Sequence, residues 1–150
     1  MIKNTRKLLM ELNRLKNNNF LNILNIKFIF ISSDIKFLIA KIPIRSKLLN
    51  PFGYLHGGVI VSFAESVGCS LSFLNLKNDE KKFYKFSLFN IEISSNHVQY
   101  VKKGFLLAEA EIFHKGKMLH LVKCNIFDEK KNTISFCKMT NLIIKNNILR

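Results

Sequence analysis

Gly57–Leu76 reads GGVIVSFAESVGCSLSFLNL, and the rest of the chain is organised around this stretch. It is apolar almost all the way round and contains a single charged residue, Glu65. A helix with this pattern must be buried on nearly every face. Because an ionised carboxylate is costly to bury without partners, Glu65 is either a reactive group or a structural acid in a special environment. We expect a central core helix over residues 57–76, with Glu65 as its candidate catalytic residue.

The length and composition predict one folded domain over residues 1–150. The chain has 48% hydrophobic residues and a mean hydropathy of +0.11, which is typical of a protein with a sizeable core. Only the helix around Glu65 approaches the roughly 18 apolar residues of a membrane span. Its Gly, Ser and carboxylate content favours a core helix instead. The N-terminus shows no apolar signal-peptide region, so we expect a cytoplasmic protein without a membrane partner.

The formal charge of +14 does not by itself predict a nucleic-acid partner. The lysines are spread among Asn, Ile and Phe rather than gathered in one patch, so we expect no nucleic acid as partner. We interpret the positive field as an attraction for anionic substrates such as nucleotide phosphates. Cys69, Cys124 and Cys137 have neither CxxC nor metal-ligand spacing, which indicates buried thiols in a reducing compartment.

Hydrophobic periodicity predicts an α+β protein in which an antiparallel sheet of about six strands wraps around the central helix. Leucines at helical spacing predict a short helix over Thr5–Lys16. Segments of period two predict strands over Phe20–Ile31, Lys36–Ile44, Phe83–His97, Phe105–His114, Met118–Asp128 and Thr133–Ile144. Short turns join the last four strands, so we expect these four to be antiparallel neighbours in a meander.

The start of the central helix combines features that suit a negatively charged oxygen. Gly57 and Gly58 let the backbone approach a ligand closely, and the first N–H groups of a helix have no internal partner. They present donors and a partial positive charge to a developing oxyanion. Glu65 lies eight residues past Gly57, about 12 Å along the helix axis, so both cannot touch one carbonyl within one chain. If both act together, two chains must form each site, and we expect an obligate dimer.

His56 and three residues near Glu65 are further candidates. His56 precedes the helix and either contacts a ligand carbonyl or a water, or acts only as a cap or packing residue. Ser62, Ser66 and Cys69 lie close to Glu65 along the helix and are candidates to support its carboxylate. A Cys69 nucleophile paired with His56 is an alternative, although apolar surroundings raise the pKa of a thiol.

Two segments that contain histidine lie on the predicted strands. The odd-numbered residues of Phe89–His97 share one strand face, so His97 either faces the helix layer or is a satisfied strand-end histidine. Glu92 has the opposite parity and is expected to face solvent. The tight turn His114–Lys117 is either a solvated hairpin or a loop that contacts phosphate.

Together these features resemble the hotdog-fold acyl-CoA thioesterases over roughly Phe20–Ile144. The residues that carry the resemblance are Asn50, PFGYLHGG at Pro51–Gly58, Glu65, Asn96-His97, His114–Gly116 and NIFDE at Asn125–Glu129. A lone HGG triplet would be weak, whereas this ordered set is specific. The segments AESVG and SSNHV are most similar to the hydrolases of 1,4-dihydroxy-2-naphthoyl-CoA in menaquinone synthesis, near the phenylacetyl-CoA and 4-hydroxybenzoyl-CoA thioesterases.

The resemblance implies a role for each matching residue. Glu65 is the nucleophile or the general base, Gly57 N–H with His56 polarises the thioester carbonyl, and Asn50 orients the carbonyl or the attacking water. The implied acyl and coenzyme A channel is lined by Asn90, His97, Val98, Gln99, Tyr100, His114, Lys115, Gly116, Lys117, Met118 and Leu119. The resemblance also implies no metal or cofactor, with coenzyme A as part of the substrate, and a homodimer or a dimer-of-dimers tetramer.

Three positions depart from the family pattern. Asn50 stands where the nearest subgroup usually has Gln, Cys69 where Ser or Thr usually supports the acid, and Asn90 where Gly is common. The expected activity is hydrolysis of an aromatic acyl-CoA to the free acid and coenzyme A. The alternatives are a broad-specificity medium-chain or phenylacetyl-CoA thioesterase, a hotdog hydratase, and a non-catalytic acyl-CoA binder.

Overall fold

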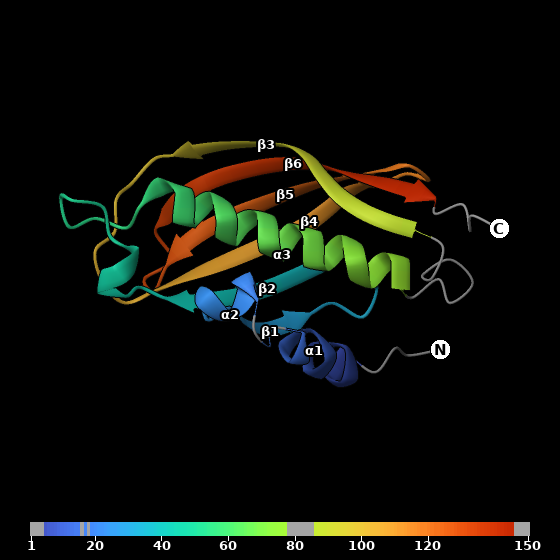
Figure 1. Cartoon of the computed structure of the whole chain (residues 1–150), viewed down its shortest axis with the longest axis horizontal. Helices are drawn as coiled ribbons and strands as arrows, with labels where there is room; N and C mark the ends of the chain where they lie inside the picture. Colours follow the sequence, from blue (N-terminus) through green and yellow to red (C-terminus); the bar gives the residue numbers. More distant parts are fainter. Residues whose placement is uncertain (1–4, 16, 18, 78–85, 146–150) are drawn as a thin grey trace.

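Six antiparallel strands form one sheet, and helix α3 lies along one of its faces (Figure 1). The structure is a computed structural model that describes residues 5–15, 17, 19–77 and 86–145. Its elements are α1 (Thr5–Arg14), α2 (Phe20–Ile23), β1 (Lys27–Ile31), β2 (Phe37–Pro43), the 3-10 turn η1 (Ser46–Leu48), α3 (Gly57–Lys77), β3 (Phe86–His97), β4 (Phe105–Lys115), β5 (Leu119–Asp128) and β6 (Thr133–Lys145). The strand order is β1-β2-β4-β5-β6-β3. This arrangement confirms the expected architecture of six strands around one long helix.

Helix α3 has the expected bounds to within one residue and supplies the core. Phe63, Val67 and Leu71 on its sheet-facing side are fully buried. Gly68 allows α3 to approach β6 closely, because a Cβ atom at this position would collide with the Met139 side chain of β6. By length and hydropathy α3 also qualifies as a membrane span, but more than half of its apolar stretch is buried inside the protein. The interpretation as a core helix therefore agrees with the structure.

The segment before β1 differs from the prediction of one continuous strand over Phe20–Ile31. It forms the short helix α2 and a turn before the strand begins. The Asn19 side chain accepts a hydrogen bond from Leu21 N–H at 3.1 Å and caps this helical turn. Asn25 then adopts a left-handed conformation with φ 54°, which does not fit a strand. Local side-chain hydrogen bonding and backbone conformation override the apolar pattern here.

The expected meander is correct for β4, β5 and β6 and wrong for β3. Strand β3 pairs with β6 at one edge of the sheet, because β2 and β5 occupy both sides of β4. The segment from β3 to β4 therefore crosses the end of the sheet instead of forming a hairpin. There Val101 O accepts a hydrogen bond from Leu55 N–H at 2.8 Å, just before α3 begins. The expected start of β3 at Phe83 lies outside the described residues.

A β-bulge in β3 changes which side chains face the helix. The register against β6 shifts within Asn90–Glu92, so the alternation expected along this strand breaks there. Phe89 and Ile91 are exposed, at 52% and 56%, although they were expected on the same face as Ile93. Ile93 packs against the core, and Glu92 is exposed as expected. Only the part of β3 after the bulge keeps the predicted parity.

We expect Asn13→Ala to lower the free energy of unfolding by about 1–3 kcal/mol. The half-buried Asn13 side chain joins α1 to β1, since it accepts from Phe28 N–H at 3.1 Å and donates to Phe28 O at 2.9 Å. The variant leaves both main-chain groups without that partner. Urea denaturation measures the change, and Asn22→Ala at an exposed position of α2 is the control. Equal losses in the two variants would contradict this account of Asn13.

Candidate functional site

The start of α3 is capped by the side chain of His56. Nδ1 of His56 accepts a hydrogen bond from Gly58 N–H at 2.9 Å, so the capping role left open by the sequence is present. Because Nδ1 is the acceptor, a neutral His56 ring carries its proton on Nε2, and the residue is exposed. Gly57 N–H donates to no described residue. The helix start therefore offers two donors, from adjacent residues, for a ligand oxygen.

His97 lies against the start of α3, and its two ring nitrogens have the opposite roles to those of His56. Its Nε2 is 3.1 Å from the position of a Cβ atom at Gly57, so a side chain there would crowd the ring. Its Nδ1 is 3.0 Å from Ser135 Oγ, which donates its own proton to Asn96 O at 3.1 Å. Ser135 Oγ therefore accepts from His97 Nδ1–H, and the lone pair remains on His97 Nε2. The ring faces the helix layer, as the strand parity predicted.

Glu65 is half-buried rather than enclosed. It lies on a stripe of α3, together with Ser62, Ser66 and Cys69, whose residues all remain partly accessible. The expectation that α3 is buried on nearly every face is therefore wrong, because the sheet covers only one side of the helix. Among the described residues no Lys, Arg or His forms an ion pair with Glu65. The carboxylate is thus available to a ligand on the uncovered side.

The candidate supporting residues of Glu65 form other hydrogen bonds. Ser66 donates to Ser62 O at 2.7 Å, within the helix itself. Cys69 Sγ lies 3.4 Å from Asn141 Oδ1 on β6. Neither Ser66 nor Cys69 has a hydrogen bond to the Glu65 carboxylate in this single chain.

Asn50 uses its side-chain oxygen to shape the loop before α3. Oδ1 accepts from Phe52 N–H at 3.0 Å and from Tyr54 N–H at 3.1 Å, and Asn50 N–H donates to Tyr54 O at 2.7 Å. Gly53 adopts a left-handed conformation with φ 80° in the same turn. Oδ1 is therefore occupied within the loop. The predicted role of Asn50, to orient a substrate carbonyl or a water, falls to its Nδ2 group.

Asn90 belongs to a hydrogen-bond network that joins β3 to β6 and α3. Its Nδ2 donates to Asn141 Oδ1 at 3.0 Å, and Asn141 Nδ2 donates to Ser72 Oγ at 2.9 Å. Asn141 and Ser72 are fully buried. The network therefore fixes the position of the bulge of β3 relative to β6 and α3.

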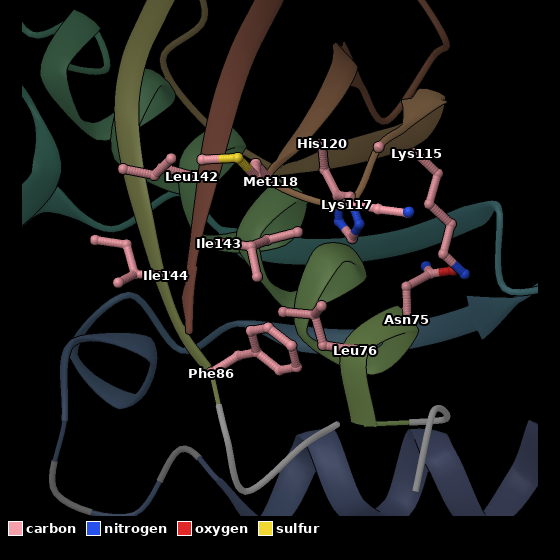
Figure 2. Close-up of a pocket in the computed structure, with 11 residues that line it drawn as sticks. Asn75, Leu76, Phe86, Lys115, Lys117, Met118, His120, Leu142, Ile143 and Ile144 are labelled. Atoms are coloured by element: carbon pink, nitrogen blue, oxygen red, sulfur yellow. The ribbon is translucent and has the colours of Figure 1, made fainter. Parts of the chain in front are cut away.

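The remaining predicted substrate-binding residues fall into two groups. Residues 98–100 are exposed, and the Tyr100 ring packs edge-on against Tyr54 with centroids 4.8 Å apart. Lys102 Nζ lies 4.3 Å from the centre of the Tyr54 ring, in the loop before α3. Residues 115–118 instead border a pocket at the other end of α3 (Figure 2). One chain therefore does not bring the two groups together.

Five buried polar residues in the described part of the chain were not anticipated from the sequence: Ser72 and Asn75 on α3, and three residues on strands. Ser135, Asn141 and His120 occupy alternating, inward-facing positions of β6 and β5. The alternation of side chains along each strand could have predicted their burial, because each shares a face with buried apolar neighbours on its strand. No group of three or more His, Cys, Asp or Glu in the described part of the chain could hold a metal ion.

We expect Cys69 to be unreactive toward iodoacetamide at pH 8. Burial, and then the charge of Glu65, raises the pKa of its thiol to about 12. Labelling should therefore speed up tenfold per pH unit above pH 9, and mass spectrometry of labelled peptides measures the rate. Urea-unfolded protein is the control. Within one chain Cys69 cannot pair with His56, since 13 residues place them about 20 Å apart along the helix axis. Fast labelling of folded protein at pH 8 would contradict this description.

Comparison with known proteins identifies the family. The family profile described as Thioesterase superfamily matches residues 52–135, which include the helix start and Glu65. A 1,4-dihydroxy-2-naphthoyl-CoA hydrolase of Escherichia coli (strain K12) is 31% identical over 140 residues, 93% of this chain and 97% of that protein. A protein of the same name from Listeria monocytogenes is 30% identical over 107 residues, 71% of this chain and 82% of that protein.

Solved structures agree with the sequence comparison. The crystal structure of a mutant thioesterase from Pseudomonas aeruginosa matches with a TM-score of 0.83 at 26% identity, over 91% of this chain and 94% of that chain. The family profile covers more than half of the chain, and the Escherichia coli relative covers nearly all of it. The chain therefore belongs to the thioesterase superfamily and is a thioester hydrolase of hotdog fold.

Proposed function

We propose that this enzyme hydrolyses an aromatic acyl-CoA, 1,4-dihydroxy-2-naphthoyl-CoA, to the free acid and coenzyme A in cytoplasmic menaquinone biosynthesis. The observation that carries the proposal is the similarity to the Escherichia coli hydrolase of that name across nearly the full length of both proteins. The Listeria monocytogenes hydrolase supports the same assignment. The net charge of +14 favours a substrate that carries several phosphate charges.

In this proposal the thioester carbonyl binds at the start of α3. Gly57 N–H and His56 Nε2–H are donors without a described acceptor, so both can donate to the carbonyl oxygen. The N-terminus of a 21-residue helix adds partial positive charge. As the carbonyl oxygen gains charge, these donors stabilise it, and one such donor is typically worth roughly 10²–10³ in kcat.

Glu65 supplies the attack on the carbonyl carbon. It acts either as a nucleophile that forms a mixed anhydride and releases coenzyme A, after which water cleaves the anhydride to the free acid and restores Glu65, or as a base that deprotonates the water attacking the thioester, with the proton passing to the leaving thiolate. The half-buried carboxylate, with no described cation paired to it, supports both routes. Asn50 Nδ2 orients the carbonyl or the water. We propose that the reaction needs no metal or cofactor, with coenzyme A entering only as part of the substrate.

The helix start and Glu65 of each site come from two protomers of a homodimer or of a dimer-of-dimers tetramer. Within one chain Gly57 and Glu65 lie about 12 Å apart along the axis, too far to act on one carbonyl. Strand β3 ends the described sheet and exposes Phe89 and Ile91. An apolar edge strand of this kind favours pairing with a second copy of the chain.

The acyl group occupies an apolar pocket next to Glu65. The pocket has a volume of about 410 Å³ and begins at Cys69, one helical turn past the carboxylate. Phe73, Phe86 and Leu88 line its walls. Its volume lies within the range of small-molecule sites, roughly 300–1,000 Å³. Coenzyme A follows the exposed residues 97–100 and the basic hairpin 114–119.

We expect Glu65→Gln to lower kcat for 1,4-dihydroxy-2-naphthoyl-CoA by roughly 10²–10⁴-fold. Gln keeps the shape of the side chain and removes a half-buried charge, so the melting temperature and coenzyme A binding should not fall. A thiol-release assay and thermal unfolding measure both. Glu92→Gln, an exposed acid on β3, is the control and should retain full activity. Retained hydrolysis by Glu65→Gln would reject the role of Glu65.

A panel of substrates tests the acyl group separately. Phenylacetyl-CoA, 4-hydroxybenzoyl-CoA and decanoyl-CoA should be hydrolysed with lower kcat/KM than the dihydroxynaphthoyl thioester. A preference for decanoyl-CoA would overturn the substrate while leaving the role of Glu65 intact.

Mixed dimers test whether two protomers share each site. His56→Ala and Glu65→Gln should each be nearly inactive alone, whereas a dimer purified with one copy of each should recover about half of the wild-type kcat. Such a dimer contains one site with both changes and one site with neither. If the two residues acted within one chain, both sites would carry a defect and no activity would return.

A further inference from the structure

The buried hydroxyl of Ser135 lies behind the ring of His97, next to the start of α3. Ser135 on β6 is fully buried, and its Oγ is 3.0 Å from His97 Nδ1, 3.0 Å from Ser95 Oγ and 3.1 Å from Asn96 O. A hydroxyl has one proton to donate and two lone pairs that accept. These three contacts therefore use the full hydrogen-bonding capacity of the Ser135 oxygen.

The carbonyl of Asn96 sets the direction of these hydrogen bonds. A carbonyl oxygen only accepts, so the Ser135 proton goes to Asn96 O. His97 Nδ1–H and Ser95 O–H must then both donate to Ser135 Oγ. Ser95 Oγ is left to accept from the Cys137 thiol, whose Sγ lies 3.2 Å away. A proton on His97 Nε2 instead of Nδ1 would place two lone pairs opposite each other and leave the buried oxygen short of a donor.

The other ring nitrogen of His97 is open to a ligand. His97 is exposed, and none of the described residues forms a hydrogen bond with its Nε2. This nitrogen lies 3.1 Å from the position of a Cβ atom at Gly57, the first residue of α3. The partial positive charge of the helix start stabilises a lone pair there and disfavours one more N–H group. Nε2 of His97 is therefore an acceptor.

The helix start thus offers a ligand both donors and an acceptor. His56 Nε2–H and Gly57 N–H suit a carbonyl oxygen. The lone pair of His97 Nε2 instead needs an O–H or N–H group of the ligand. An acyl-CoA carries such groups near its thioester in two places. One is a hydroxyl on the acyl group beside the carbonyl, and the other is the first amide N–H of the coenzyme A arm.

We propose that Ser135 is a positioning residue for substrate binding. It holds His97 in the tautomer that carries its proton on Nδ1, so that Nε2 accepts a hydrogen bond from an O–H or N–H group next to the thioester carbonyl. Ser135 is fully buried and acts only through His97. The inference rests on the proposed binding of the thioester at the start of α3, and it does not depend on which acyl group is hydrolysed.

Nitrogen NMR of protein with isotope-labelled histidine at pH 8 tests the tautomer without any substrate. The ring signals of His97, assigned by their loss in His97→Ala, should show a protonated Nδ1 and an unprotonated Nε2 in wild type. Ser135→Ala should populate the form protonated on Nε2. Ser95→Ala is the matched control, because it removes another hydrogen bond to the same oxygen without touching His97, and it should keep the wild-type tautomer.

Two matched pairs of thioesters test the binding role and identify the donor. One pair is 2-hydroxybenzoyl-CoA and benzoyl-CoA. The other is the benzoyl thioester of N-acetylcysteamine and its analogue with an ester oxygen in place of the amide N–H. In wild type the member with the donor should have an about fivefold lower KM in one of the pairs.

The variants show whether that difference depends on Ser135, and comparing them cancels the intrinsic reactivity of each thioester. Ser135→Ala should remove the difference in KM with little change in kcat. Ser135→Cys should keep part of it, since sulfur is a weaker acceptor. Ser95→Ala should keep all of it. Melting temperatures of the variants separate this role from a general loss of stability, which would not follow the tautomer.

Four results would overturn the proposal. They are a wild-type His97 with its proton on Nε2, an unchanged tautomer in Ser135→Ala, and a KM difference that is absent in wild type or persists in Ser135→Ala. The fourth is an equal fall in kcat for all four thioesters, which would place His97 at the attacking water. If the enzyme hydrolyses no thioester, the proposed function fails, while the NMR result and calorimetric Kd values for the same thioesters still decide the role of Ser135.

Discussion

The packing of one side of α3 against the sheet is the interaction on which the rest of the structure depends. Fully buried apolar side chains such as Phe63 and Leu71 fill that side, and Gly68 brings the helix close to β6. Because the sheet covers only this side, the stripe that contains Glu65 and Cys69 stays accessible. A single helix can therefore stabilise the core and hold a carboxylate toward a ligand.

The start of the same helix is organised by two histidines with opposite ring polarity. His56 accepts from Gly58 N–H and so presents a proton on Nε2, whereas His97 donates to Ser135 and keeps a lone pair on Nε2. The donor side of His56 adds to the partial positive charge of the helix start. Hydrogen bonds to neighbouring residues, rather than the histidines themselves, decide which nitrogen serves a ligand.

The buried polar groups differ in whether they have hydrogen-bond partners. Under the bulge of β3, Asn90 donates to Asn141 and Asn141 donates to Ser72, and this network joins three elements. At the far end of α3, His120 has a buried nitrogen with no described partner in a largely apolar pocket.

The sequence by itself determined the α+β class, the bounds of α3, most of the strands, and the family, because period and motif spacing report local burial and local chemistry. It also singled out Glu65 and the adjoining helix start. Only the tertiary structure decided the edge position of β3, the bulge that turns Phe89 outward, and the half-exposure of Glu65. It likewise decided that the Asn50 oxygen shapes its own loop and that Asn90 bonds to Asn141. These features depend on which remote segments pair and which side chains meet across them, and no pattern within one segment contains that information.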